Sequence, residues 1–170
     1  NVFQILSIGS KEMKRSVSFK EFNAGLNLEP IVFSLTHRKE GPEWSIEKCR
    51  LVEKWYRRYF YLVSLYPESG LVPSKDIDVF WHTHILDTRK YMEDCDHLLG
   101  RYFHHFPYFG MRGKEDRKNL KRAFEETELL YLKHFGESLR SLEIADCGAL
   151  CNEPTPRYGL IHGLERPVLH

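Results

Sequence analysis

The sequence lacks a long apolar run, an excess of charge of one sign and a high cysteine content. Charged residues or prolines interrupt every apolar stretch, far short of the roughly 20 residues that a membrane-spanning helix needs. Twenty-five Lys and Arg residues balance 24 Asp and Glu residues, so no overall field favours nucleic acid or an anionic membrane. We therefore expect neither an integral membrane protein nor a nucleic-acid-binding protein.

Cysteine is too scarce for a disulfide scaffold, with four residues in a chain of 170. Cys49 and Cys95 fall within helical patterns, which is typical of free buried thiols. Cys147 and Cys151 lie four residues apart, and three interpretations remain open: part of a metal site, a reversible disulfide, or two ordinary thiols. The first residues lack the order of a secretory signal, so we expect a cytoplasmic protein.

Several catalytic signatures are also missing. The sequence has no phosphate-cradling glycine loop, no nucleophile elbow and no Cys-His order of a known protease. The basic residues between Lys114 and Arg122 alternate with acidic ones, which is typical of a solvated helix face. These absences disfavour nucleotide-dependent and covalent hydrolytic chemistry.

Helical spacing of apolar residues dominates the chain, and period-two alternation is nearly absent. Ser45 is a candidate N-cap for a long helix that ends before Pro67. Ser74 can begin a second helix, which continues or kinks on its way to Gly100. Residues 114–135 predict another helix, and residues 31–35 predict a short helix, with a strand as the alternative. The pattern indicates an all-α fold.

Composition changes at two places along the chain. Residues 103–113 hold Pro107, two glycines and five aromatic or Met side chains, which predicts a tightly packed apolar loop. From Ser141 onward, prolines and glycines predict an irregular tail. We therefore expect one compact, helical bundle-like domain over residues 1–140, followed by a tail over residues 141–170.

Histidine is concentrated in one segment of the sequence. Five of the nine histidines lie within 24 residues, and five aspartates share the same region: His82, His84, His97, His104 and His105 with Asp76, Asp78, Asp87, Asp94 and Asp96. Imidazoles and carboxylates together suit zinc, iron or manganese. The segment therefore predicts a transition-metal site, with zinc or iron as the expected metal.

Helix geometry limits which of these side chains can act together. Positions two apart on a helix point about 200° apart, so His82 and His84 cannot face one ion from a regular helix. Asp78 and His82 are four apart and share a face. Two arrangements remain open: Asp78 and His82 bind a metal with His104 or His105, or the helix breaks so that His82 and His84 converge.

A structural interpretation stands beside the metal hypothesis. A helical His beside Trp is often hydrogen-bonded to a carboxylate, and Asp78 with His82 could be such a pair. A metal-free His-Asp couple for acid-base chemistry is a third alternative. His134 lies on the apolar stripe of its helix, and we interpret it as a satisfied core histidine.

The same segment resembles a known family. The residues that carry the resemblance are Gly70-Leu71-Val72-Pro73, Asp78, Trp81-His82-Thr83-His84, Leu86, Tyr91, Asp94-Cys95 and His104-His105. Together they are similar to the core pattern of the glycine-rich domain-containing protein-like family, over roughly residues 28–136. The resemblance implies a functional site but supplies no reaction, because the family's biochemistry is largely unassigned. The eleven scattered glycines form no glycine-rich region, so roles tied to that region are not transferred.

Two hypotheses about function follow. The first is a small metal-dependent enzyme acting on a small molecule or peptide, with ligands chosen from His82, His84, His104, His105 and Asp78. In that enzyme Tyr91 and Asp94 would orient ligands or act as acid or base. The alternative is a non-enzymatic module that binds a peptide or protein through the aromatic segment, with a structural His/Asp pair. The sequence sets no oligomeric state.

Overall fold

The computed structural model describes residues 17–37 and 43–139. Within these ranges the fold is all-α, and Ser74 and Phe106 alone take part in isolated β-bridges. The helices in order are α1 (Phe19–Ala24), α2 (Glu29–Thr36), α3 (Ile46–Leu65), α4 (Lys75–Leu86), α5 (Thr88–Leu99) and α6 (Lys114–Phe135). None of them is both long and apolar enough to cross a bilayer. The expected helical fold is confirmed, whereas the predicted tail lies outside the described residues.

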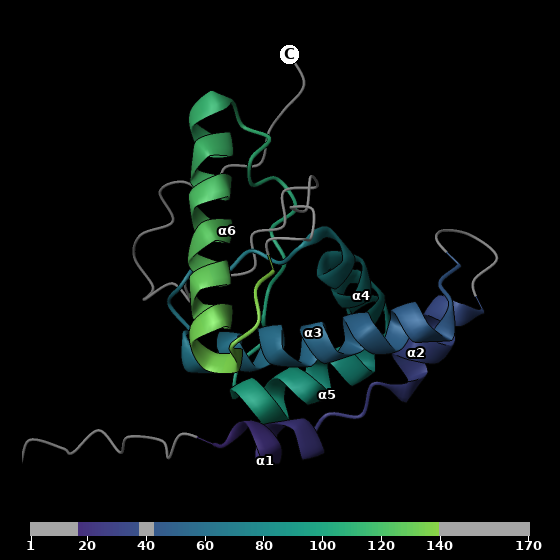
Figure 1. Cartoon of the computed structure of the whole chain (residues 1–170). Helices are drawn as coiled ribbons and strands as arrows, with labels where there is room; N and C mark the ends of the chain where they lie inside the picture. The colour runs from purple at the N-terminus through teal and green to yellow at the C-terminus, as the bar shows by residue number, and fades with distance from the viewer. Residues whose placement is uncertain (1–16, 38–42, 140–170) are drawn as a thin grey trace, which may run out of the picture.

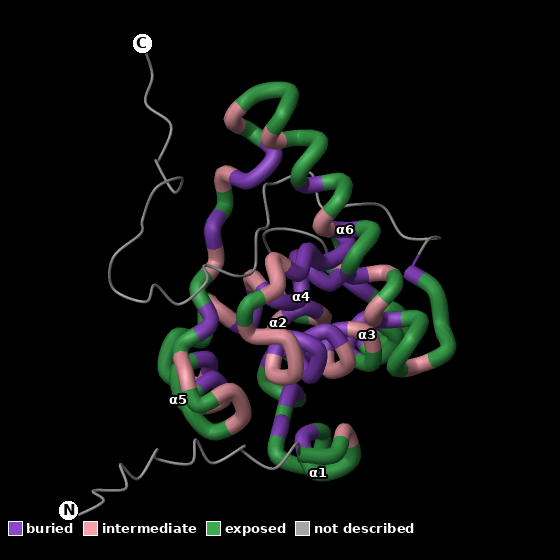
Figure 2. The backbone as a smooth tube through the Cα atoms, turned by 90° about the vertical axis from the view of Figure 1, so that its left-hand side faces the viewer, coloured by how far each residue is buried: buried purple, intermediate pink, exposed green. Residues whose placement is uncertain are grey.

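Helix α3 is the centre of the bundle, and α1, α2, α4, α5 and α6 all contact it (Figure 1). It begins as predicted at Ser45, whose hydroxyl accepts a hydrogen bond from the Lys48 amide at 3.2 Å. Its inward face carries buried Val52, Tyr56 and Phe60. Figure 2 shows buried positions concentrated along α3 and α4, while α1, α5 and α6 keep exposed faces. The helix therefore forms the inner wall against which the site is built.

A break at Asp87 separates α4 from α5, so the second predicted helix kinks rather than continues. Asp87 has φ −81° and ψ 71°, values outside the helical region. Helix α5 then ends at Gly100, whose φ of 66° is left-handed and favours glycine. The change of direction places the inner face of α5 against both α3 and α4. As a result, Tyr91 and Cys95 are buried, and Tyr91 lies beside Trp81.

The aromatic loop after α5, residues 100–113, packs as predicted. Phe106 and Phe109 form a second apolar cluster with Val72 from the segment before α4, and with Leu120 and Phe124 from α6. The C-terminal half of α6 lies against α3, and its other end extends away beside this loop (Figure 1). The cluster therefore fixes the loop from the side of α6.

Asp116 closes the aromatic loop from the first turn of α6. Its Oδ2 accepts hydrogen bonds from the amides of Gly110 at 2.7 Å and Arg112 at 3.1 Å. The Arg112 guanidinium also lies 2.9 Å from Oδ1. Gly110 has a φ of 84°, and a Cβ there would lie 2.6 Å from Leu120, so glycine is required. One carboxylate thus fixes the end of the loop.

Asp116→Asn is expected to lower the free energy of unfolding by about 1–3 kcal/mol at pH 7, because it removes charge-assisted hydrogen bonds. Burial alone would raise the pKa of Asp116, but the bonds from Arg112 and Gly110 outweigh it and lower that pKa below its ordinary value. Because the pKa of Asp116 is lower in the folded protein than in the unfolded chain, its carboxylate stabilises the fold at pH values above the unfolded-state pKa. This stabilisation is lost as the pH falls through the folded-state pKa.

Urea unfolding from pH 7 to pH 2.5 measures this effect, and the difference between wild type and Asp116→Asn should shrink below about pH 4. Glu115→Gln is the matched control, since Glu115 forms an exposed ion pair with Lys118 and should contribute under about 0.5 kcal/mol. A pH-independent difference would show that the Asp116 charge does not stabilise the loop.

One residue was misplaced by the helical pattern. His134 follows the apolar stripe of α6, yet it is exposed and its Nε2 lies 2.8 Å from the hydroxyl of Tyr66. The prediction of a core histidine is therefore wrong, because the buried stripe of α6 continues from Tyr131 to Phe135, which packs against the core, rather than to His134. Cys49 and Cys95 are free and buried, as predicted, whereas Cys147 and Cys151 lie outside the described residues.

Candidate metal centre

Helix α4 provides two of the three residues in the candidate site. It is continuous from Lys75 to Leu86, so the alternative in which it breaks to bring His82 and His84 together does not occur. Asp78 and His82 lie one turn apart on the same face. The Asp78 side chain is 1% exposed and that of His82 is 40% exposed. The pair therefore extends from the interior to the surface.

His105 completes the group from the aromatic loop. Its Nε2 lies 2.8 Å from Nε2 of His82 and 3.8 Å from Oδ1 of Asp78. The same Asp78 oxygen lies 3.6 Å from Nε2 of His82. Within the described residues, this is the group of His, Cys, Asp or Glu side chains that could hold a metal ion. The structure thus brings together three of the five predicted ligands.

The triangle formed by these three atoms has the size of a metal site. Sides of 2.8, 3.6 and 3.8 Å leave a point about 2.0 Å from all three atoms, close to ordinary Zn–N and Zn–O bond lengths. An ion slightly outside their plane would have one or more positions left for other ligands. The three atoms could therefore coordinate one ion together.

The electrostatics of the group suit a neutral imidazole. Burial lowers the pKa of His82, and the nearby imidazole of His105 lowers it as well, while Asp78 acts in the opposite direction. A metal-binding histidine must be neutral. His82 therefore has the protonation state of a ligand at neutral pH without first losing a proton.

His84 lies on a different side of α4 and has two protein partners. Its Nδ1 lies 2.8 Å from the Tyr56 hydroxyl and its Nε2 lies 2.9 Å from Oδ2 of Asp94. The Lys90 ammonium donates to the same Asp94 oxygen at 2.8 Å. The His84 side chain is fully buried. Because both ring nitrogens are occupied, His84 lies outside the candidate metal group.

The hydrogen bonds of His84 fit one arrangement of charges on His84 and Asp94. Burial lowers the pKa of His84, although Asp94 opposes the shift. Burial alone would raise the pKa of Asp94, but hydrogen bonds from His84 and Lys90 outweigh it and lower that pKa. The consistent arrangement is a neutral ring that accepts from Tyr56 at Nδ1 and donates from Nε2 to the Asp94 carboxylate. Asp94 thus lies where it orients His84.

Tyr91 is fully buried, and its hydroxyl is bonded within the protein. Its hydroxyl accepts from Nε1 of Trp81 at 3.0 Å and donates to the Phe103 carbonyl at 2.6 Å. Burial raises its pKa well above the ordinary value, so it stays protonated. The hydroxyl therefore connects α4 to the aromatic loop, and its predicted role as an acid or base remains a prediction.

His104 and Asp76 lie outside the group formed by Asp78, His82 and His105. His104 is exposed, and its ring lies 4.7 Å from that of Tyr102. Asp76 forms an ion pair with Lys48 at 3.1 Å. Tyr56 on α3 is a partner of His84 that the sequence patterns do not identify. No spacing rule connects Tyr56 to His84, because the contact joins residues 28 apart.

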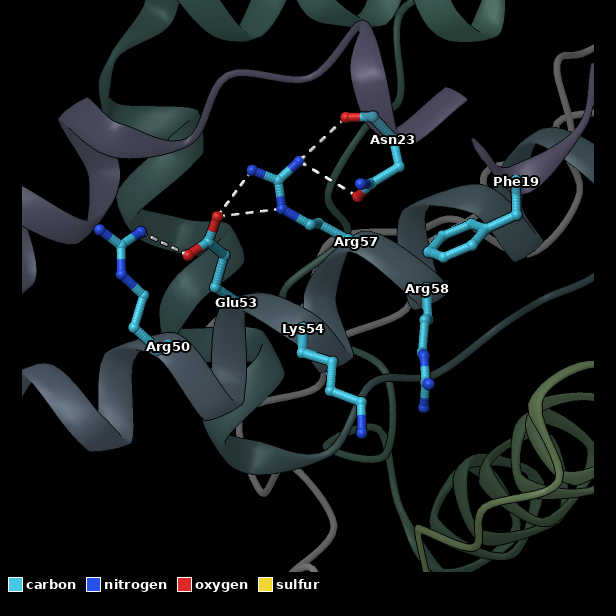
Figure 3. Close-up of a pocket in the computed structure, with 7 residues that line it drawn as sticks. All are labelled: Phe19, Asn23, Arg50, Glu53, Lys54, Arg57 and Arg58. Carbon is cyan, nitrogen blue, oxygen red and sulfur yellow. Dashed lines mark hydrogen bonds and ion pairs between the residues drawn. The ribbon is translucent and has the colours of Figure 1, made fainter. Parts of the chain in front are cut away.

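A separate cavity of about 330 Å³ lies on the opposite face of α3 (Figure 3). Its lining residues are Phe19, Asn23, Glu53 and the four basic residues Arg50, Lys54, Arg57 and Arg58. Arg57 is bonded to Glu53 at 2.6 Å and to the Leu26 carbonyl at 2.6 Å. Arg58 and Lys54 both contact Glu137, which follows α6. Since these cations have acidic partners, the cavity is a junction between α1, α3 and the end of α6.

The comparisons with known proteins establish the family. The family model described as UCP032817-like matches residues 25–128, and the chain belongs to the UCP032817-like family. It is also similar to two proteins of Arabidopsis thaliana, as the sequence resemblance predicted. Glycine-rich domain-containing protein 1 is 33% identical over 85 residues, and glycine-rich domain-containing protein 2 is 31% identical over 85 residues.

Each of these matches covers 48% of this chain and 10% of the relative. The chain therefore spans about a tenth of the length of these relatives. No solved structure matches the chain. The family is thus shown by sequence.

Proposed function

We propose that the protein binds one divalent transition metal through Oδ1 of Asp78, Nε2 of His82 and Nε2 of His105, and that this centre makes it a small metal-dependent enzyme. The single observation that carries the proposal is the triangle of three ligand-type atoms with a common point about 2.0 Å from each. Two imidazoles and one carboxylate suit zinc, and they also suit non-haem iron.

The open side of the group favours catalysis over a purely structural role. Structural zinc sites are closed by four protein ligands, whereas catalytic sites keep a position for water or substrate. Here three side chains come together among the described residues, and His82 borders solvent with 40% of its side chain exposed. A bound metal would supply Lewis acidity and lower the pKa of a coordinated water.

The three proposed ligands differ in charge and in burial. Asp78 supplies the negative charge from the buried side, and the imidazoles of the largely buried His105 and the part-exposed His82 supply nitrogen donors. Tyr91 hydrogen-bonds to Trp81, the residue before His82, whereas Asp94 orients His84 outside the group of proposed ligands. A role of either residue as acid or base stays a prediction. The substrate reaches the centre from the exposed side of His82.

A second function, a peptide- or protein-binding module, has one observation in its favour. A cavity of about 370 Å³ is lined by Met92, Glu93, Asp96 and Tyr102. The aromatic segment itself fits the module less well, because Phe103, Phe106 and Phe109 are at most 8% exposed. A partner that binds the metal-free protein as tightly as the metal-loaded protein would favour this alternative.

Asp78→Asn tests the carboxylate directly. As a ligand, Asp78 contributes both an oxygen donor and a negative charge. We therefore expect the zinc affinity of the variant to fall by more than about 100-fold, which exceeds the usual effect of losing a residue that only orients a ligand. Competition with a chromophoric chelator measures the affinity. Asp76→Asn is the matched control, two residues away and ion-paired with Lys48, and should retain zinc binding.

Other outcomes for Asp78→Asn have distinct meanings. A loss of about 10–100-fold would make Asp78 a residue that orients His82. Unchanged zinc affinity with a lower melting temperature would make the pair purely structural and contradict the proposal.

A further inference from the structure

The buried hydroxyl of Tyr91 joins the two elements that carry the metal ligands. It accepts from the indole of Trp81 on α4, the residue before His82. It donates to the carbonyl of Phe103, two residues before His105. Both bonds are buried, so water cannot replace them at low cost. The two hydrogen bonds of Tyr91 therefore fix the distance between α4 and the aromatic loop, close to the candidate metal site.

The Trp81 ring transmits this restraint to His105. The indole stacks on Phe103 with ring centroids 4.9 Å apart and an interplanar angle of 23°. It also meets the edge of His105 at 4.7 Å and 60°. Trp81 is fully buried, so its ring cannot turn without displacing these neighbours. The orientation of His105 thus depends on a ring that Tyr91 holds.

We propose that Tyr91 is a positioning residue of the metal centre, holding His105 at coordination distance from Asp78 and His82. This inference rests on the proposed metal function. A position error of about 1 Å is large for a metal ligand, whose bond lengths are fixed within about 0.2 Å. Losing the hydroxyl frees the Phe103 carbonyl to move toward another donor, and His105 moves with it.

Tyr91→Phe in the full chain tests the inference, with Tyr59→Phe as the matched control. Tyr59 is equally buried and donates to the Leu71 carbonyl at 3.1 Å, away from the loop that carries His105. Each variant loses one buried hydroxyl from the same core. We expect Tyr91→Phe to weaken zinc binding about 10–100-fold, the usual effect of losing a residue that orients a ligand. Tyr59→Phe should change it less than about threefold.

Two further measurements separate positioning from general destabilisation. Melting temperatures without metal should fall in both variants, whereas the absorption spectrum of bound Co²⁺ should change only in Tyr91→Phe, because it reports coordination geometry. If Tyr91→Phe does not fold, Trp81→Phe serves instead. It removes the indole donor and part of the ring that contacts Phe103 and His105, and it should also weaken zinc binding more than Tyr59→Phe does.

The outcomes distinguish this inference from the metal proposal itself. If the wild type binds no zinc, cobalt or ferrous iron, the metal proposal fails. If the wild type binds zinc, and Tyr91→Phe and Tyr59→Phe have equal affinities and equal cobalt spectra, the metal proposal survives and the role of Tyr91 is overturned.

Discussion

His105→Ala is expected to abolish measurable zinc binding, with an affinity at least about 100-fold below that of wild type. The substitution removes one of three donors and leaves Asp78 and His82 as an incomplete site. The fold should survive, because the loop is also held by Phe106, Phe109 and Asp116. Isothermal titration of metal-free protein with zinc measures the effect.

His104→Ala is the control for this prediction. His104 is the adjacent residue in the sequence, is exposed and lies outside the group of candidate ligands. Its replacement should change zinc affinity by less than about threefold. Equal losses of zinc affinity in the two variants, or a loss in His104→Ala alone, would show that His105 is not the third ligand.

His84→Ala is expected to have the largest effect on stability, a decrease of about 2–4 kcal/mol in the free energy of unfolding. The substitution leaves a cavity and removes the partner of both the Tyr56 hydroxyl and the Asp94 carboxylate. For a chain of this size the melting temperature should fall by roughly 5–15 °C. Thermal and urea unfolding of the metal-free protein measure the change.

Zinc affinity should respond much less, by under about tenfold, because His84 faces away from the metal group. His134→Ala is the stability control, since its exposed bond to Tyr66 should contribute under about 1 kcal/mol. A His84→Ala variant that keeps its stability and loses zinc would make His84 a ligand and contradict the assignment made here.

The sequence predicted the helices well because their local signals agree with the tertiary fold. Ser45 caps α3, Gly100 ends α5, and the predicted helix over residues 114–135 matches α6 in both bounds. The short apolar segment around Val32 is helical, as favoured over a strand. The error at His134 arose because the positions three and four residues after Tyr131 both fit the helical period, and packing places Phe135 rather than His134 against the core.

The candidate site could be predicted only in part. The spacing of four between Asp78 and His82 is a local property of a helix and was correct. The choice between His104 and His105 was open, because side-chain directions in a loop depend on packing rather than on a period. Here Trp81 and Phe103 decide it, since they place the His105 ring against α4.

His84 illustrates the same limit. Its place in the His-Thr-His sequence suggested a ligand beside His82, and helix geometry alone showed only that the two rings diverge. Its partners, Tyr56 on α3 and Asp94 on α5, come from other helices, so no pattern in the sequence near His84 specifies them.

The X-ray absorption spectrum of the zinc-loaded full chain tests the central claim most directly, because it reports the ligand atoms and their distances. The account predicts one zinc per chain with nitrogen and oxygen donors at about 2.0–2.2 Å, two of them imidazoles, and no sulfur. A chain that takes up no zinc, or a spectrum with sulfur at about 2.3 Å, would contradict a centre built from Asp78, His82 and His105.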